Sequence, residues 1–336
     1  MADKVLMKGN EAIAEAAIIA GCRHYFGYPI TPQTEIAAYM AKRMPKIGGT
    51  FLQAESEIAA INMVLGASSA GVRTMTSSSS PGISLKSEGI SYIAGSDLPC
   101  VIVNVQRGGP GLGGIQPSQS DYWQATKALG HGDFQLLVYA PSSVQETVDM
   151  TFRAFENADR YRMPAMILTD GFLGQMMEPV SFPDNKTTEY EKPWACTGHN
   201  EKRKRNVVTS LFLKPDDLEN SVRERFKRYE TVKAECPEAE VFMCDDAQIV
   251  LCAYGATSRV VKSAVRQARE KGIRAGLFRP KTLYPFPEKE LRQSANPPAD
   301  AHPPRLRDVR AEEHPAGRDV PEPPGTPHRR LQRRHP

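Results

Sequence analysis

The sequence lacks the features that mark iron–sulfur, membrane and nucleic-acid-binding proteins. Its six cysteines stand at least eight residues apart, so no CxxC pair signals a zinc ribbon or an iron–sulfur cluster. No apolar run reaches the roughly 20 residues of a membrane helix, and the first residues contain no signal-peptide core. The net charge of +4 over 336 residues gives no reason to expect nucleic acid. We expect a cytoplasmic protein whose cysteines are buried thiols.

What the sequence contains is a regular alternation of strand and helix patterns as far as about residue 170. We expect helices over 9–21, 31–44, 56–71, 82–95, 120–129 and 143–162. We expect strands over 24–29, 50–55, 72–78, 99–106, 134–140 and 164–170. This alternation predicts an α/β fold with βαβ units and a parallel sheet covered by helices on both faces.

Composition divides the chain into four parts. Residues 1–180 carry the alternation, and residues 181–245 read as a polar linker ending in a charged helix. Residues 246–293 begin a second, smaller α/β unit. Residues 294–336 hold ten prolines and eight arginines but neither lysine nor aromatic residues, so they cannot bury a core and are expected to be disordered. We interpret this tail as an altered reading frame; a native, solvated tail is the alternative.

A stiff loop, "GYPITP", follows the first expected strand. Pro29 and Pro32 bracket Thr31, which is predicted to cap the next helix with Pro32 at its first position. A simple connector needs only flexibility. The loop is therefore expected to hold something in place beside Thr31.

The glycine-rich stretch "GGPGLGG" (108–114) matches the G-x-G-x-x-G pattern of dinucleotide-binding folds. It follows at least the fourth strand rather than the first, and Pro110 and Pro117 interrupt it. We therefore disfavour the NAD site, although it stays open as an alternative. Arg107, at the carboxyl end of the preceding strand, is a candidate anion ligand, and a surface arginine covering the sheet end is the other reading.

Hydroxyl and acidic side chains flank two further helix starts. The stretch "SSSSPG" (77–82) could hold a phosphate or carboxylate at a helix N-terminus, or could be a capped turn. Glu55 and Glu57 lie at the start of another helix, where acids commonly interact with the helix dipole. Neither stretch decides a function by itself.

Taken together, several motifs resemble one family, the α subunits of 2-oxoacid:ferredoxin oxidoreductases, in particular the branched-chain 2-oxoacid (2-ketoisovalerate) type. The similarity covers residues 1 to about 292 and rests on many motifs in order. These are "GNEAIAEAAIIAG", "GYPITPQTEI", "QAESEIAAINMVLGAS", "TSSSSPG", "VNVQRGGPG", "QPSQSDYWQA" and "GHGDF", followed by "YGATSRVVKSAVRQAREKGI" and "RPKTLYPFP".

The resemblance implies a thiamine-diphosphate-binding pyrimidine domain (1–180), followed by a transketolase C-terminal-like domain in residues 246–293. It implies that Glu57 bonds the aminopyrimidine ring from an apolar pocket, and that Arg107 pairs with the substrate carboxylate. The Y-P-I-T-P loop would lie beside the cofactor and substrate, with Thr31 presenting its hydroxyl. The implied cofactor-binding residues are Tyr28, Pro29, Ile30, Thr31, Glu57 and Ser80.

The implied reaction converts a 2-oxoacid, coenzyme A and oxidised ferredoxin to acyl-CoA, carbon dioxide and reduced ferredoxin. No G-D-G motif followed by asparagine is present, so Mg²⁺ and the diphosphate are expected on a β subunit. The [4Fe-4S] clusters are expected on partner chains that include γ and ferredoxin-like δ subunits. The residues leave open which 2-oxoacid is used, with 3-methyl-2-oxobutanoate favoured over pyruvate and 2-oxoglutarate. A catalytically silent assembly subunit remains a second alternative.

Overall fold

The computed structural model describes residues 4–183, 188–199 and 201–295. Its helices and helical turns are α1 (Gly9–Ile19), α2 (Thr34–Arg43), η1 (Met44–Ile47), α3 (Glu57–Ser69), α4 (Ser80–Gly95), η2 (Gln124–Ala128), α5 (Val144–Tyr161), α6 (Gly171–Gln175), α7 (Pro215–Glu235), α8 (Gly255–Glu270) and α9 (Glu288–Ala295). Its strands are β1 (Val5–Lys8), β2 (His24–Gly27), β3 (Thr50–Gln53), β4 (Thr74–Ser78), β5 (Val101–Gln106), β6 (Leu137–Tyr139), β7 (Ala165–Asp170), β8 (Met177–Val180), β9 (Ala239–Phe242), β10 (Ile249–Cys252), β11 (Ala275–Pro280) and β12 (Thr282–Tyr284).

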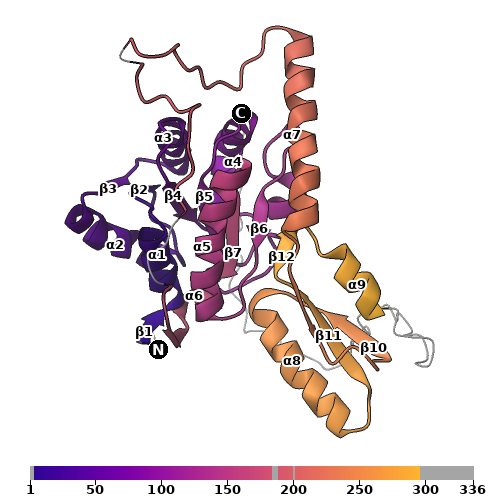
Figure 1. Ribbon diagram of the computed structural model, residues 1–336. Coiled ribbons are helices and arrows are strands. Elements are labelled where there is room, and N and C mark those ends of the chain that lie inside the picture. Colours follow the sequence, from indigo (N-terminus) through magenta and orange to yellow (C-terminus); the bar gives the residue numbers. More distant parts are fainter. Residues whose placement is uncertain (1–3, 184–187, 200, 296–336) are drawn as a thin grey trace, which may run out of the picture. The chain divides into compact units, whose positions relative to one another are not determined.

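The largest sheet has seven strands in the order β12-β6-β7-β5-β4-β2-β3 (Figure 1). Strands β2 to β7 of this sheet are mutually parallel, and β12 pairs antiparallel with β6. The central strands β4, β5 and β7 are buried along their whole length, as expected for a parallel sheet covered on both faces. The predicted α/β fold with its parallel sheet is confirmed.

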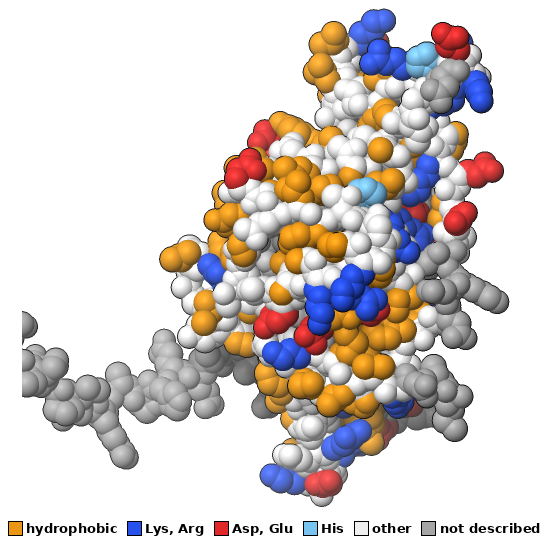
Figure 2. Space-filling view, turned by 90° about the vertical axis from the view of Figure 1, so that its left-hand side faces the viewer, with side chains coloured by type: hydrophobic (Ala, Val, Ile, Leu, Met, Phe, Trp, Pro, Cys, Tyr) orange, Lys and Arg blue, Asp and Glu red, His pale blue; other side chains and the backbone are white. Residues whose placement is uncertain are grey.

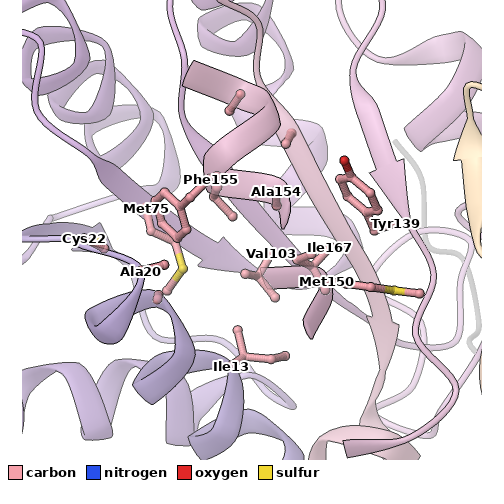
Figure 3. Packing of buried hydrophobic residues seen from close by; sticks show 14 of the residues in the cluster. Ile13, Ala20, Cys22, Met75, Val103, Tyr139, Met150, Ala154, Phe155 and Ile167 are labelled. Atoms are coloured by element: carbon pink, nitrogen blue, oxygen red, sulfur yellow. The ribbon is translucent and has the colours of Figure 1, made fainter. Parts of the chain in front are cut away.

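Alternate residues of each strand enter two separate cores, because side chains of a strand point to opposite faces. Val103 and Ile167 pack with α1, α2 and α5, whereas Ile102 and Met166 pack with α3 and α4. Figure 3 shows the first of these cores, in which Ile13 of α1 and Phe155 of α5 lie against the sheet. Helices on both faces therefore hold the carboxyl ends of the strands in fixed positions.

A smaller three-stranded sheet, in the order β10-β11-β9, carries α8. Its strand β9 comes from residues that the sequence placed in the linker, and β12, which follows β11 in the chain, pairs with the seven-stranded sheet. Arg279 of β11 joins the two regions because its buried guanidinium binds Glu146 of α5 and Glu240 of β9. The limits of the predicted domains remain a prediction.

Some local predictions are wrong. Helix α2 begins at Thr34 with Gln33 as the preceding residue, so Thr31 is not its cap. The expected helix over 120–129 is shorter in the structure, where the helical residues run from 122 to 128 and include η2. Cys196 and Cys252 are exposed rather than buried. Residues 294 and 295 of the predicted disordered tail belong to α9, and the rest of that tail lies outside the described residues.

Candidate active site at the carboxyl edge of the seven-stranded sheet

The sheet changes direction of winding between β2 and β4. The chain leaves β2 towards β3 on one side and later returns to β4 on the other, so the loops that follow β2 and β4 diverge. In open parallel sheets such a switch point forms a crevice outside the carboxyl ends of the strands, and ligands bind there. The loop of residues 28–33, the residues 78–80 and the start of α3 all lie at this edge.

The loop after β2 is fixed by a chain of buried hydrogen bonds. Gln33 is fully buried, and its amide nitrogen donates to the Tyr28 carbonyl while its Oε1 accepts from the Ser77 hydroxyl at 2.5 Å. The Ser77 oxygen also lies 2.6 Å from the Tyr25 hydroxyl. From α1, the Asn10 side chain donates to the Pro32 carbonyl at 2.9 Å. The loop is therefore held by the fold itself, as its two prolines suggested.

Thr31 and Arg107 are brought together. The guanidinium of Arg107 donates through Nη1 to the Thr31 carbonyl at 3.1 Å and through Nη2 to the Leu112 carbonyl at 2.9 Å. Its Nε–H group is buried and has no partner among the described residues. Arg107 is 7% exposed, whereas Thr31 is exposed to solvent. The structure thus places a buried cation with spare donors next to a presented hydroxyl.

The two acids at the start of α3 have different surroundings. Glu57 begins α3 and is 6% exposed, whereas Glu55 lies in the preceding loop and is exposed. The main-chain carbonyl of Glu57 accepts a hydrogen bond from the Lys86 amine. Within the described residues, no partner is found for the Glu57 carboxylate. Gly82 of α4 leaves room for that carboxylate, since a Cβ there would lie 2.8 Å from Oε1. Glu57 is therefore a buried acid with unused oxygens.

Ser80, predicted to bind the cofactor, is already engaged inside the protein. Its hydroxyl donates to Asp121 Oδ2 at 2.6 Å and accepts from the Arg107 amide at 3.0 Å. Ser78 and Ser79 belong to the stretch 77–82 but were not singled out as cofactor ligands, and their hydroxyls are buried and lack partners in the part of the chain that the structure describes. Their position at the end of β4, directly before a helix, was the available signal.

A cavity of about 640 Å³ opens beside this cluster. Its walls are Thr31, Pro32, Thr34, Glu35, Ile115, Pro117, Gly171, Phe172, Gln175 and Met176. No lysine or arginine belongs to this wall. Burial raises the pKa of Glu35, but hydrogen bonds from Gln175 and Asn10 outweigh it and bring that pKa below its usual range. The cavity is thus mostly apolar, with one ionised acid at its side.

The glycine-rich loop does not form a nucleotide cradle. Residues 107–121 contain no helix, and the loop closes on itself because the Gly114 amide donates to the Gly108 carbonyl. Within the described ranges, no cluster of three or more His, Cys, Asp or Glu side chains could hold a metal ion, and no helix is long and apolar enough to cross a membrane. The loop serves to enclose the Arg107 side chain.

Comparison with known protein families matches the chain to a thiamine-diphosphate-binding family. Residues 15–240 match the pyruvate flavodoxin/ferredoxin oxidoreductase thiamine-diphosphate-binding family, and residues 247–299 match core domain II of pyruvate:ferredoxin oxidoreductase. The chain belongs to the 2-oxoacid:ferredoxin oxidoreductase family. The resemblance inferred from the motifs is confirmed, and the chain contains the thiamine-diphosphate-binding domain of this family.

Two relatives and one solved structure show how close the similarity is. The chain is 51% identical to ketoisovalerate oxidoreductase subunit VorB of Methanothermobacter thermautotrophicus over 292 residues, 87% of this chain and 83% of that protein. It is 39% identical to 2-oxoglutarate synthase subunit KorA of Methanothermobacter marburgensis, and the match covers 88% of this chain and 86% of that protein. The structure of 2-oxoglutarate:ferredoxin oxidoreductase from Magnetococcus marinus, with 2-oxoglutarate, coenzyme A and succinyl-CoA bound, matches with a TM-score of 0.77 and 31% identity. The match covers 86% of this chain and 56% of that one.

Proposed function

We propose that this oxidoreductase subunit supplies the pyrimidine-binding half of a thiamine diphosphate site for oxidising a branched-chain 2-oxoacid such as 3-methyl-2-oxobutanoate. The observation that carries the proposal is the buried Glu57, whose carboxyl has no partner among the described residues, at the same carboxyl edge of the sheet as the Arg107–Thr31 pair. The products are the branched acyl-CoA and carbon dioxide, and the electrons pass to ferredoxin.

The residues present fit thiamine diphosphate. An aminopyrimidine ring offers ring nitrogens and an amino group, and the crevice offers an unused buried carboxyl together with the unpartnered hydroxyls of Ser78 and Ser79. Leaving the two serine hydroxyls buried and unsatisfied is costly, so a polar ligand stabilises them. When bound, the cofactor supplies an electron sink for the decarboxylation of a 2-oxoacid.

Each side chain has a distinct task in this proposal. Glu57 holds and returns a proton at its carboxyl oxygen, in a site where burial excludes water. Arg107 orients the substrate carboxylate through the donors that the loop leaves free, a planar task that lysine would perform less well. Thr31 presents its hydroxyl to the reacting groups, and Tyr28, Pro29 and Ile30 shape the loop around them. Ser80 keeps Arg107 in place, because its hydroxyl accepts from the Arg107 amide.

The cavity supports an uncharged, branched substrate side chain. Ile115, Phe172 and Met176 provide apolar walls, and the ionised Glu35 would repel a second carboxylate such as that of 2-oxoglutarate. Burying a branched alkyl group there is favourable by roughly 25 cal/mol per Å² of apolar surface. This favours the substrate named for the VorB relative over that named for the KorA relative.

Partner chains complete the enzyme in this proposal. We assign Mg²⁺ and the diphosphate to a β subunit, and the [4Fe-4S] clusters to partners that include γ and ferredoxin-like δ subunits. Leu52 of β3, Ile58 of α3 and Leu85 of α4 are 40–51% exposed. Figure 2 shows hydrophobic side chains gathered on the face that carries α2 and α3 in Figure 1. An exposed apolar face of this kind is suited to binding a β subunit. We place the complex in the reducing cytoplasm.

The test is reconstitution of the complex with a panel of 2-oxoacids. We expect activity with 3-methyl-2-oxobutanoate, a kcat/KM for 2-oxoglutarate at least tenfold lower, and no 2-oxoacid-dependent dye reduction by this chain alone. Tight NAD binding by the isolated chain would favour a dehydrogenase instead. Full activity of a complex carrying Glu57→Gln would favour a catalytically silent assembly subunit.

A further inference from the structure

Lys86, in the middle of α4, is the least expected charged residue of the fold. Its side chain is fully buried, with 0% of its surface exposed. Helical spacing places it on the same face as Ile83 and Ile90, which belong to the core between α3, α4 and the sheet. Lysines are almost never buried this deeply unless they are paired. The reason for its burial must therefore lie in its contacts.

The amine of Lys86 joins three elements at the start of α3. Its Nζ donates to the Thr76 hydroxyl of β4 at 3.1 Å and to the main-chain carbonyl of Glu57 at 3.3 Å. Gly82, one turn earlier on the same face of α4, lies against the Glu57 carboxylate. No carboxylate forms a direct ion pair with Lys86 in residues 4–183, 188–199 and 201–295. Helix α4 thus approaches Glu57 at two residues, Gly82 and the cationic Lys86.

The electrostatic neighbours of Lys86 are few. Burial lowers the pKa of Lys86 to about 8, against the charge of Glu57, which raises it. Among the elements packed against Lys86, α3 presents Glu57 and β4 presents the uncharged Thr76. The proposed catalytic acid is therefore the one charge within the described residues that acts appreciably on this amine.

Resting on the function proposed for Glu57, we propose that Lys86 is a positioning residue: its buried ammonium fixes the first turn of α3 and is the counter-charge of the Glu57 carboxylate. Lys86 touches neither cofactor nor substrate in this proposal. It acts by keeping the acid in place until a ligand enters the crevice. Loss of the Lys86 proton would release this hold, so the working site would weaken at alkaline pH.

The decisive experiment is a double-mutant cycle on the full chain without cofactor, using Lys86→Met, Glu57→Gln and the double variant. Urea unfolding would be measured at pH 7 and at pH 9.5. At pH 7 we expect a favourable coupling of roughly tenfold in the unfolding equilibrium constant. At pH 9.5 it should largely vanish, because the wild-type amine is then mostly neutral. An effect of Lys86→Met that is independent of Glu57 and of pH would overturn the proposal.

The pH dependence of stability gives a second readout with a defined sign. The folded-state pKa of Lys86, about 8, is below that of an exposed lysine, so the unfolded chain binds more protons between these values. The cost of burying the ammonium is present below pH 8 and is relieved as the pH rises towards the unfolded value. Stability of wild type relative to Lys86→Met should therefore rise over this window. If Lys86→Met does not fold, Lys86→Gln and Thr76→Val take its place in both measurements.

The assembled complex separates this inference from the proposed function. With Lys86→Met, the alkaline limb of the pH profile of kcat/KM should shift by about one pH unit or more, whereas the KM for coenzyme A stays unchanged. If Glu57→Gln leaves activity intact, the proposed function fails even where the stability cycle shows coupling. If Glu57→Gln abolishes activity but the cycle shows no coupling, the role of Lys86 alone is refuted.

Discussion

The guanidinium of Arg107 donates a hydrogen bond to the main-chain carbonyl of Thr31, across 76 residues of sequence and at 3.1 Å. The contact joins the loop after β2 to the loop after β5, on opposite sides of β4 in the sheet order. It leaves the Thr31 hydroxyl exposed while it holds the Thr31 backbone in place. Arg107 therefore holds the loop in place, and in the proposed function it also orients the substrate carboxylate.

Arg107→Ala should mainly weaken substrate binding. Loss of a charge-assisted hydrogen bond is worth roughly 1.5–3 kcal/mol, so the KM for the 2-oxoacid should rise about 10- to 100-fold. Steady-state kinetics of the reconstituted complex would measure it, with the KM for coenzyme A expected to stay constant. Arg107→Lys keeps the charge but loses the planar fork, so it should restore binding only in part. An equal rise in both KM values would mean that Arg107 supports the fold rather than the substrate.

Glu57→Gln should slow the chemical step. Glutamine is nearly isosteric and can remain at the start of α3, but it cannot exchange a proton. The rate should fall by roughly 10²- to 10⁴-fold, as is typical when a general acid–base group is lost. Exchange of the C2 proton of thiamine diphosphate in the assembled complex is the direct measurement. Glu55→Gln is the matched control, because Glu55 is exposed two residues away. A larger loss in the control would move the assignment to Glu55.

Gly82→Ala should disturb the same acid sterically. The added Cβ would lie 2.8 Å from Glu57 Oε1 and would also clash with the Ser78 hydroxyl, so the carboxylate must move. We expect at least a tenfold loss of activity. Replacing glycine by alanine in a helix normally raises the free energy of unfolding by about 1 kcal/mol, and we expect no such gain here. Gly66→Ala in α3 is the control for stability, since its Cβ would meet open space. Urea unfolding that shows equal stabilisation by both substitutions would contradict the tight packing.

The junction between the two sheets should be acid-sensitive through Glu146. Burial raises the pKa of Glu146, but hydrogen bonds from Arg279 and its charge outweigh this and hold that pKa at about 2. Because the folded-state pKa is depressed, the stabilisation is complete above about pH 4.5 and is lost as pH falls towards 2. Glu146→Gln should cost roughly 2 kcal/mol at pH 7 and progressively less on acidification. Urea unfolding at several pH values would measure the difference.

The matched control for the junction is Glu219→Gln. Glu219 forms an exposed ion pair with Arg223 within α7, and such pairs contribute little. It should change stability by less than about 0.5 kcal/mol at any pH. A constant cost of Glu146→Gln from pH 7 to pH 3 would contradict the assigned pKa.

Much of the fold follows from local sequence patterns. The continuous apolar run of β5 and the alternating helices predicted the parallel sheet, because both depend on spacing alone. The short strand β9 and the pairing of β12 with β6 were not predictable, since they depend on contacts between segments distant in the chain. For the same reason Thr31 was misassigned as a helix cap. The buried Gln33–Ser77 hydrogen bond delays the helix start, and no local signal reports it.

The site was only partly predictable. Glu57 could be separated from Glu55 by helical phase, since Ile61 and Val64 follow it at the spacing of a buried face. The same reasoning applied to α4 would have placed Lys86 among buried isoleucines. However, lysine is a residue type that is usually exposed to solvent. Motif resemblance indicated the chemistry, whereas burial and hydrogen bonding decide which side chains remain free to perform it.

Ile115→Lys should change the preferred substrate. Ile115 is 62% exposed and forms part of the cavity wall with Thr31, so a lysine there adds a cation without disturbing the core. A second carboxylate would then find a partner, and the kcat/KM for 2-oxoglutarate relative to 3-methyl-2-oxobutanoate should rise by roughly tenfold, as for one charge-assisted contact. Leu112→Lys is the control, because Leu112 lies in the same loop, is 81% exposed and does not belong to the wall. Equal shifts in both variants would show that the added charge acts at long range and that the cavity does not receive the substrate side chain.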